Sequence, residues 1–229
     1  MKASPGARSW MAAGVRHELL TRALPALRHE MAAPVSVVRM GVLLLKRQAA
    51  DPAADPAALV ERATLIDEQV TQLAGAIRSL RDWELATQDE GVTRSALVAQ
   101  CAALMRVAFE LQGVGLRVAD TLAPRDGEAR FPSGAALRYM VLGALGYLHD
   151  SVPGIGEIVI EPDGDEGLRF RAGSGSAEPA DPMAGAHRAP RALAIDTVAL
   201  QSLADGLGYE VAVDGAELSF GMNPAGTAA

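Results

Sequence analysis

Apolar residues recur every three or four positions through two neighbouring segments near the start of this chain. The second segment follows a strict heptad pattern, with alternating steps of four and three residues: Leu59, Ala63, Ile66, Val70, Leu73, Ile77 and Leu80. The first segment carries a stripe with similar spacing: Leu20, Leu24, Leu27, Met31, Val35, Val38, Val42 and Leu45. This spacing is typical of helices that bury one side against another helix. The sequence therefore predicts two long amphipathic helices.

Two Asp-Pro pairs, at 51–52 and 55–56, separate these helices. A residue before proline avoids the helical conformation, whereas proline itself suits the first turn of a helix. We therefore predict a first helix over residues 14–50 and a second that begins near Pro56. Two helices joined by so short a loop form an antiparallel hairpin.

Pro25 and Pro34 fall inside the first predicted helix. Each removes one backbone hydrogen bond and can bend the helix. Two interpretations follow. Pro34 would kink the helix, and Pro25 would mark its true start; we keep both interpretations, so residues 14–24 could form a separate short turn.

One hairpin offers too little surface to bury both apolar stripes. Two hairpins related by a two-fold axis would form a four-helix bundle, so the seam predicts a homodimer. The alternative is a monomeric bundle in which the C-terminal part of the chain covers the seam.

The composition of the 229 residues limits the partners and the compartment. A net charge of −7 disfavours nucleic acid and an anionic membrane as main partners. The single cysteine, Cys101, lies in an apolar helical pattern, where we expect a core residue, and one cysteine suits a reducing cytoplasm. The first residues lack the apolar stretch of a signal peptide, and the longest apolar run, near 140–148, is too short to span a bilayer. We expect a cytoplasmic protein.

From Gly91 the periodicity changes to alternating short helices and strands. We predict helices over 95–112, 135–149 and 194–207, and strands over 116–119, 157–161, 168–171, 209–213 and 217–220. Helices segregated from mostly antiparallel strands indicate a two-layer α+β sandwich. A Gly/Ala/Pro-rich loop spans 173–190. The expected organisation is a disordered N-terminus over 1–13, a helical hairpin over 14–88, a sandwich over 89–223 and a tail over 224–229.

One histidine of the first helix stands apart from the core pattern. His29 lies two residues from Leu27 and two from Met31, so helical geometry places it on the side opposite the apolar stripe. Glu30 follows it directly. An exposed histidine beside a carboxylate on a rigid helix is a candidate nucleophile. His17, followed by Glu18, is a second candidate, but its spacing from Leu20 places it on the apolar stripe.

Residues 29–34, His-Glu-Met-Ala-Ala-Pro, resemble the H-box of two-component sensor histidine kinases, His-Glu-x-x-x-Pro. The resemblance implies a dimerisation and histidine-phosphotransfer domain in which the histidine carries a phosphoryl group. The order of elements after Gly91 is similar to that of the ATP-binding domain of the same kinases. The resemblance therefore covers most of the chain.

The residues that hold the nucleotide in that family are replaced here. The positions of its two asparagines fall on Gly143 and Tyr147, and Arg171 stands where an aspartate should accept the adenine amino proton. Tyrosine supplies no suitable oxygen for Mg²⁺, and arginine has no acceptor. The last glycine motif would fall near residues 191–194, where it is absent. We therefore expect no ATP binding, no intrinsic cofactor and no bound metal.

A phosphoryl-accepting histidine beside a degenerate nucleotide site is similar to the ChpT-type histidine phosphotransferases. That resemblance implies a dimer that relays phosphoryl groups between the receiver domains of a hybrid histidine kinase and of response regulators, with Mg²⁺ supplied by the receiver. His29 would attack the aspartyl phosphate, and Glu30 would fix the tautomer of the ring. Two alternatives stay open: an active kinase with a divergent nucleotide site, and a non-catalytic dimeric scaffold that sequesters a response regulator.

The surface around His29 would receive the receiver domain. Small side chains on the histidine's side of the helix would allow close approach, a flexible methionine extends that surface, and two arginines could meet the acidic pocket of a receiver. These expected docking residues are Ala32, Ala33, Ser36, Met40, Arg28 and Arg39. Bifunctional histidine kinases often carry threonine or asparagine at the position of Ala33, so we expect weak phosphatase activity.

Overall fold

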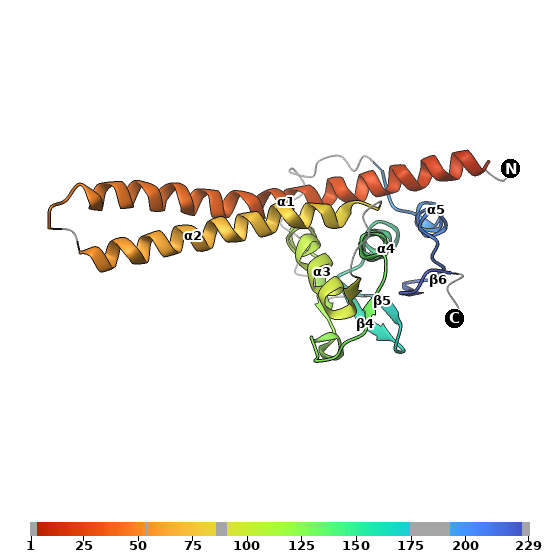
Figure 1. Ribbon diagram of the computed structural model, residues 1–229. Coiled ribbons are helices and arrows are strands. Elements are labelled where there is room, and N and C mark those ends of the chain that lie inside the picture. The colour runs from red at the N-terminus through yellow and green to blue at the C-terminus, as the bar shows by residue number, and fades with distance from the viewer. Residues whose placement is uncertain (1–3, 54, 86–90, 175–192, 226–229) are drawn as a thin grey trace. The chain divides into compact units, whose positions relative to one another are not determined.

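The computed structural model describes residues 4–53, 55–85, 91–174 and 193–225 (Figure 1). The chain divides into two compact units, one formed by residues 24–87 and the other by residues 1–23 together with 88–229. The first unit is a helical hairpin. The second is a mixed α+β domain that also includes the first turns of the N-terminal helix.

The hairpin consists of α1 (Pro5–Ala49), of which residues 24–49 belong to this unit, and α2 (Pro56–Ser79), followed by a 3₁₀ turn over Leu80–Trp83. Asp55 caps α2 by accepting a hydrogen bond from the Ala57 amide at 2.9 Å, and Pro56 occupies the first turn. The predicted pair of helices and its Asp-Pro loop are therefore confirmed.

The start of α1 differs from the expectation. The helix begins at Pro5 and not at Gly14, so residues 5–13, expected to be disordered, are helical. The Ser4 hydroxyl accepts from the Ala7 amide at 3.2 Å, and Ala12 and Val15 are buried. Tertiary burial of small and apolar side chains thus extends the helix beyond what its own periodicity predicted.

Residues 14–24 are also not a separate turn, because α1 continues without a break through both prolines. The described residues 4–23 belong to the same compact unit as the C-terminal part of the chain. The compact units divide at Leu24, just before Pro25, and not at residue 14, where the hairpin was expected to begin. We call residues 5–23 of α1 the arm.

The heptad seam of α2 divides into two sets of side chains. Leu59, Ile66 and Leu73 are half-buried, and a methyl group added at Gly41 of α1 would lie 2.8 Å from Cγ1 of Ile66. Ala63, Val70 and Ile77 are exposed, the last two by 47% and 52%. No residue of α2 is buried within this chain. One half of the seam thus joins the hairpin, and the other half is uncovered.

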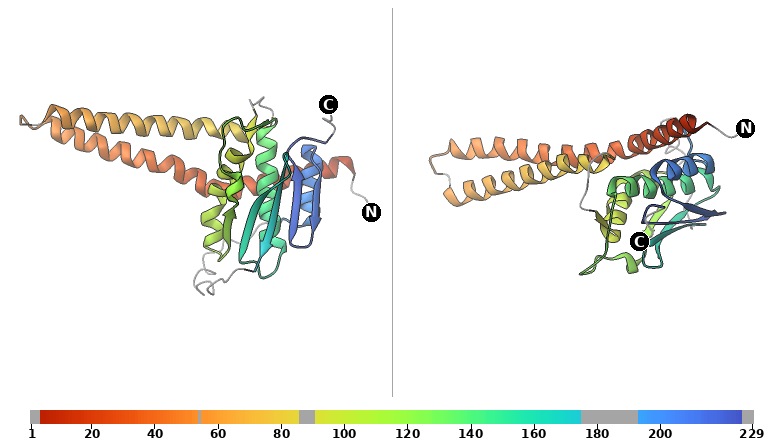
Figure 2. Two further views of the ribbon diagram at one scale, coloured as in Figure 1. Left: turned by 90° about the horizontal axis from the view of Figure 1, so that it is seen from below. Right: turned by 45° about the vertical axis from the view of Figure 1, so that its right-hand side comes forward.

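The α+β domain, which we call the sandwich domain, comprises the described residues 91–174 and 193–225 (Figure 2). Its helices are α3 (Arg94–Glu110), α4 (Gly134–Ser151) and α5 (Thr197–Leu207), with a 3₁₀ turn over Asp120–Leu122. Its main strands are β2 (Gly115–Val118), β4 (Glu157–Asp163), β5 (Gly167–Gly173), β6 (Val211–Asp214) and β7 (Glu217–Gly221). These elements agree with the predicted ones to within a few residues.

The five strands form one sheet in the order β2-β4-β5-β7-β6. Only the β2–β4 pair is parallel, and its register joins Leu116 to Ile158. A small second sheet, which the sequence analysis did not predict, pairs β1 (Val92–Thr93) with β3 (Arg130–Phe131). Two-residue strands are too short to show a periodicity.

One face of the sheet is buried, and the other carries charged side chains. Its inward side chains are fully or almost fully buried: Ile158, Ile160, Leu168, Phe170, Leu218 and Phe220. Charged side chains of the other face pair across strands, as in the Arg171–Glu161 contact at 2.9 Å. This alternation is typical of a sheet with one solvated face.

Helix α4 forms the centre of the domain, because every residue from Gly134 to His149 is buried. A helix that is apolar on all sides must be covered on all sides. Cys101 of α3 lies against it, with its Sγ 4.0 Å from the Arg138 carbonyl, and is buried as expected. Burial raises the pKa of the Cys101 thiol to about 12, so this cysteine is a core residue.

The predicted loop over 173–190 begins one residue too early, because Gly173 still belongs to β5. Residues 175–190 of that loop and 226–229 of the predicted tail lie outside the described residues. Among the helices that the structure describes, none has the length and apolar character needed to cross a bilayer. The described residues likewise contain no cluster of three histidine, cysteine or carboxylate side chains suited to a metal ion.

Candidate functional site

His29 lies in the middle of α1, and its side chain is exposed. Glu30 and Arg28, its neighbours in sequence, are exposed as well. Leu27 is buried and Met31 is half-buried, so the helix turns its apolar side inward and carries the histidine outward. The exposed histidine has a carboxylate beside it on a regular helix.

The next turns of α1 present mostly small, exposed side chains. Ala32, Ala33 and Ser36 are all exposed, and the Ser36 hydroxyl donates to the Ala32 carbonyl at 3.1 Å. Because of this hydrogen bond, the hydroxyl points back toward the backbone of its own helix. The side chains of these turns therefore project little from the helix.

Larger exposed side chains lie at the end of this surface. Met40 is 57% exposed, and Arg39 is exposed beside it. All eight residues expected to form the site therefore belong to one helix of one unit, and all eight are exposed.

Pro34 has a different place from the residues around it. It is buried, whereas Ala33 and Val35 on either side are exposed. The proline of the H-box-like segment therefore faces inward and contributes to packing, not to the exposed surface.

The second His-Glu pair differs from the first in its acid. His17 is exposed, which corrects the expectation that it lies on the apolar stripe. Glu18, however, is only 8% exposed, and its Oε1 accepts from Nε of Arg22 at 2.9 Å. Because Glu18 is committed to this ion pair, His17 has no free carboxylate on its following residue.

Helix α4 carries the positions at which the nucleotide-binding asparagines were expected to be replaced. A methyl group added at Gly143 would lie 2.5 Å from Cδ2 of Leu203 and 3.8 Å from Cδ1 of Leu19. Side chains of α5 and of the arm thus fill the space beside this position. Tyr147 is buried, with 7% of its surface exposed.

Arg171, expected to replace an adenine-binding aspartate, lies in β5 and pairs with Glu161 of β4. Its guanidinium is therefore part of the charged face of the sheet. The expected position of the last glycine motif falls partly outside the described residues, since 191 and 192 are not described.

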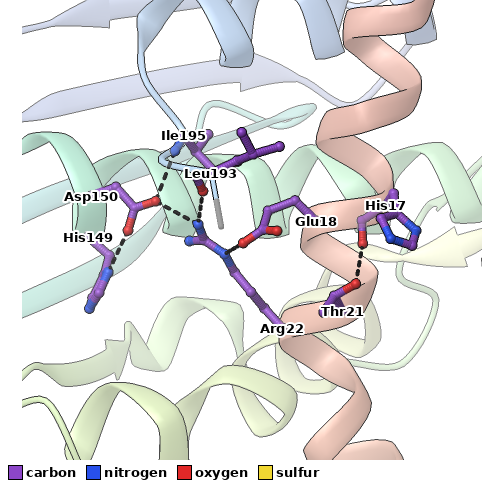
Figure 3. A network of polar contacts seen from close by, with 8 residues as sticks. All are labelled: His17, Glu18, Thr21, Arg22, His149, Asp150, Leu193 and Ile195. Atoms are coloured by element: carbon purple, nitrogen blue, oxygen red, sulfur yellow. Dashed lines mark hydrogen bonds and ion pairs between the residues drawn. The ribbon is translucent and has the colours of Figure 1, made fainter. Parts of the chain in front are cut away.

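The sequence analysis missed a polar network at the junction of the arm with the sandwich domain (Figure 3). Asp150, at the end of α4, accepts from the Ile195 amide at 2.9 Å, and its Oδ2 lies 2.9 Å from Nη2 of Arg22. The same Nη2 donates to the Leu193 carbonyl at 2.6 Å. Nδ1 of His149 lies 2.9 Å from Oδ1 of Asp150. No sequence motif marks these residues, because their contacts join distant segments.

The network sets the charge of its acid. The side chain of Asp150 is 0% exposed. Burial alone would raise the pKa of this carboxyl, but hydrogen bonds from His149, Arg22 and the Ile195 amide, together with the charge of Arg22, lower it to about 2. Asp150 is thus a buried carboxylate at neutral pH that is paired with Arg22.

No protein-family model matches this chain, and no curated protein matches it. The functional interpretation therefore depends on the residues and contacts described above.

Proposed function

We propose that this protein is a histidine phosphotransferase that relays phosphoryl groups between receiver-domain aspartates through His29. The observation that carries the proposal is the exposed His29–Glu30 pair on α1, which is followed by exposed small side chains that project little from the helix. An exposed imidazole can approach a partner's phosphoaspartate, and the small side chains leave room for the partner.

The chemistry requires one bond exchange in each direction. A ring nitrogen of His29 attacks the phosphorus of the donor's aspartyl phosphate, the P–O bond to that aspartate breaks, and the aspartate leaves as a carboxylate. A second receiver's carboxylate then attacks the phosphohistidine, and the P–N bond breaks. The transfer is in line through a loose transition state, so the protein contributes mainly positioning. Glu30 holds the tautomer, and Mg²⁺ belongs to the receiver.

Two features support transfer without ATP. The space beside Gly143 is filled by Leu203 and Leu19, and Arg171 pairs with Glu161. An asparagine at position 143 would need room that these leucines occupy. The phosphoryl group would therefore come from another protein and not from a nucleotide.

The uncovered half of the α2 seam supports a homodimeric four-helix bundle. Val70 and Ile77 are about half exposed in this chain. Exposed aliphatic residues at heptad spacing are typical of helices that pair with a second copy. We include the dimer, and a cytoplasmic location, in the proposal.

The decisive experiment incubates a phosphorylated receiver domain with the wild type, with His29→Ala and with His17→Ala. Acid-labile, base-stable phosphate is expected on the wild type and on His17→Ala, and none on His29→Ala. Label that persists on His29→Ala would contradict the proposed site.

Two further outcomes would favour the alternatives. Label transferred from the γ-phosphate of ATP to the wild type, with ATP binding in calorimetry, would indicate an active kinase. Tight binding of a receiver with no label across a panel of phosphorylated receivers, unchanged in His29→Ala, would indicate a scaffold that sequesters a response regulator.

A further inference from the structure

The arm packs along small residues of the sandwich domain. A methyl group added at Gly206 of α5 would lie 2.6 Å from Cβ of Ala12, and one added at Gly146 of α4 would lie 3.5 Å from Cδ2 of Leu19. Ala12 and Leu19 are each only 1% exposed. Glycine at position 206 therefore provides space that the arm occupies, whereas a methyl at position 146 would make only ordinary van der Waals contact with Leu19.

A buried ion pair fixes the same arm at a second point. Arg22 pairs with Asp150, whose side chain is 0% exposed, and also donates to the Leu193 carbonyl (Figure 3). A buried carboxylate that loses its cationic partner is strongly destabilised. The contact with α5 at Gly206 and the ion pair with Asp150 of α4 both hold the arm.

Pro25 lies two residues after the end of the arm and weakens the helix at that point. Proline has no N–H to donate to the carbonyl four residues earlier, which belongs to Thr21, and its ring crowds that carbonyl. The helix nevertheless runs unbroken from Pro5 to Ala49. Since short helical segments depend on tertiary packing, docking of the arm accounts for this continuity.

We propose that docking of the arm on the sandwich domain positions His29 for phosphoryl transfer by keeping α1 helical through Pro25. This inference rests on the proposed function, because it concerns the transfer rate at His29. Without docking, α1 would fray back to Pro25, so His29 would lie near the end of a shortened helix, where the backbone is held less firmly than in the middle of a long one. Arg22 and Asp150 are then positioning residues that act through the helix.

The test variant is Gly206→Ala, measured in the full chain. The added methyl favours α5 itself, because alanine is the better helix former, but it meets Ala12 of the docked arm. We expect amide hydrogen exchange of residues 12–24 to accelerate. At saturating phosphorylated receiver, the transfer rate constant should fall by about tenfold, since a small misplacement of the reacting group is costly. The receiver concentration at half-saturation should stay unchanged.

Two variants distinguish positioning from general damage. The double variant Ala12→Gly/Gly206→Ala removes the opposing methyl and should restore both exchange protection and rate. Pro25→Ala in the Gly206→Ala background should restore the rate alone, because the regained Thr21 hydrogen bond keeps the helix intact without docking. Gly14→Ala is the matched control, since a methyl there meets no atom within 4 Å and should not accelerate exchange.

Each remaining outcome has a defined meaning. Accelerated exchange with an unchanged transfer rate would overturn the positioning role. If Pro25→Ala does not recover the lowered rate, docking of the arm does not act on His29 through the continuous helix. If the wild type accepts no phosphoryl group from any receiver, the proposed function fails, and the exchange data still decide whether the arm docks at Gly206.

Discussion

The two His-Glu pairs of α1, at residues 17–18 and 29–30, differ in the surroundings of their acids. Glu18 is buried in an ion pair with Arg22, whereas Glu30 is exposed beside His29. We therefore expect the Glu18 carboxylate to stabilise the fold through Arg22, and the Glu30 carboxylate to orient the imidazole of His29.

Substitution of Glu30 should therefore lower mainly the phosphotransfer rate, and substitution of Glu18 mainly the free energy of unfolding. Glu30→Ala should lower the phosphotransfer rate by about tenfold with little change in stability, since only the orientation of the ring is lost. Glu18→Ala should lower the free energy of unfolding by about 1–3 kcal/mol, because Arg22 loses a partner, and should lower the transfer rate less than Glu30→Ala does. Single-turnover transfer and urea unfolding of both variants would test this, and equal effects on both quantities would contradict the assignment.

Asp150 makes stability depend on pH in the acid range. Its pKa is lowered from 3.8 to about 2 in the folded chain, so its contribution is present in full above pH 3.8 and is lost as the pH falls toward 2. The free energy of unfolding of the wild type should therefore decline across this window. Asp150→Asn, which cannot titrate, should show a smaller decline over the same window in urea titrations at pH 5 and pH 2.5.

The small side chain at position 33 leads to a gain-of-function prediction. Ala33→Thr places a hydroxyl four residues after His29, where it can orient a water toward a docked phosphoaspartate. Loss of phosphate from a receiver, with catalytic amounts of protein and no second receiver, should become measurable in Ala33→Thr and stay slow in the wild type. Ala33→Val, similar in shape but without the hydroxyl, is the control.

At the scale of the element, close contact of α1 with α2 depends on one glycine. A methyl group at Gly41 would lie 2.8 Å from Cγ1 and 3.2 Å from Cδ1 of Ile66, whereas one at Gly75 of α2 would meet nothing within 4 Å of this chain. Both glycines lie inside helices, where alanine is intrinsically favoured by up to about 1 kcal/mol.

Alanine substitutions at Gly41 and Gly75 compare the cost of overpacking with the gain in helix propensity. Gly41→Ala should lower the melting temperature, because overpacking costs about 1–3 kcal/mol and exceeds the helix-propensity gain. Gly75→Ala should raise it slightly or leave it unchanged. Thermal unfolding followed by circular dichroism would test both. A stabilised Gly41→Ala would mean that Ile66 moves aside without cost.

At the scale of the whole molecule, the uncovered seam predicts association. The exposed half of the seam includes Val70 and Ile77, and no residue of α2 is buried within one chain. Val70→Asp should convert the dimer into a monomer, because it would bury an unpaired carboxylate between the two copies. Thr71→Asp, an equal change of charge one position away, should leave the dimer intact. Sedimentation or light scattering would distinguish these masses, and a wild type that is monomeric would remove the bundle from the proposal.

The sequence by itself determined the local elements of this protein. Apolar spacing located both hairpin helices, and the exposed side of α1 at His29 followed from its distance to Leu27 and Met31. The helix end at Gly208, with φ +79°, and the turn at Gly215, with φ +57°, were predictable because these backbone conformations favour glycine. Such features depend only on neighbours within a few residues.

The tertiary structure decided where α1 begins and what its first turns contact. Residues 5–13 carry no clear periodicity, and Pro25 favoured a break that does not occur. The partners of the arm, Gly206 and Asp150 among them, lie far along the chain. Local patterns measure the preference of a segment alone, whereas burial of Leu19 and pairing of Arg22 exist only once distant segments have met. The docking of the arm was therefore unpredictable from sequence, whereas the exposure of His29 was predictable.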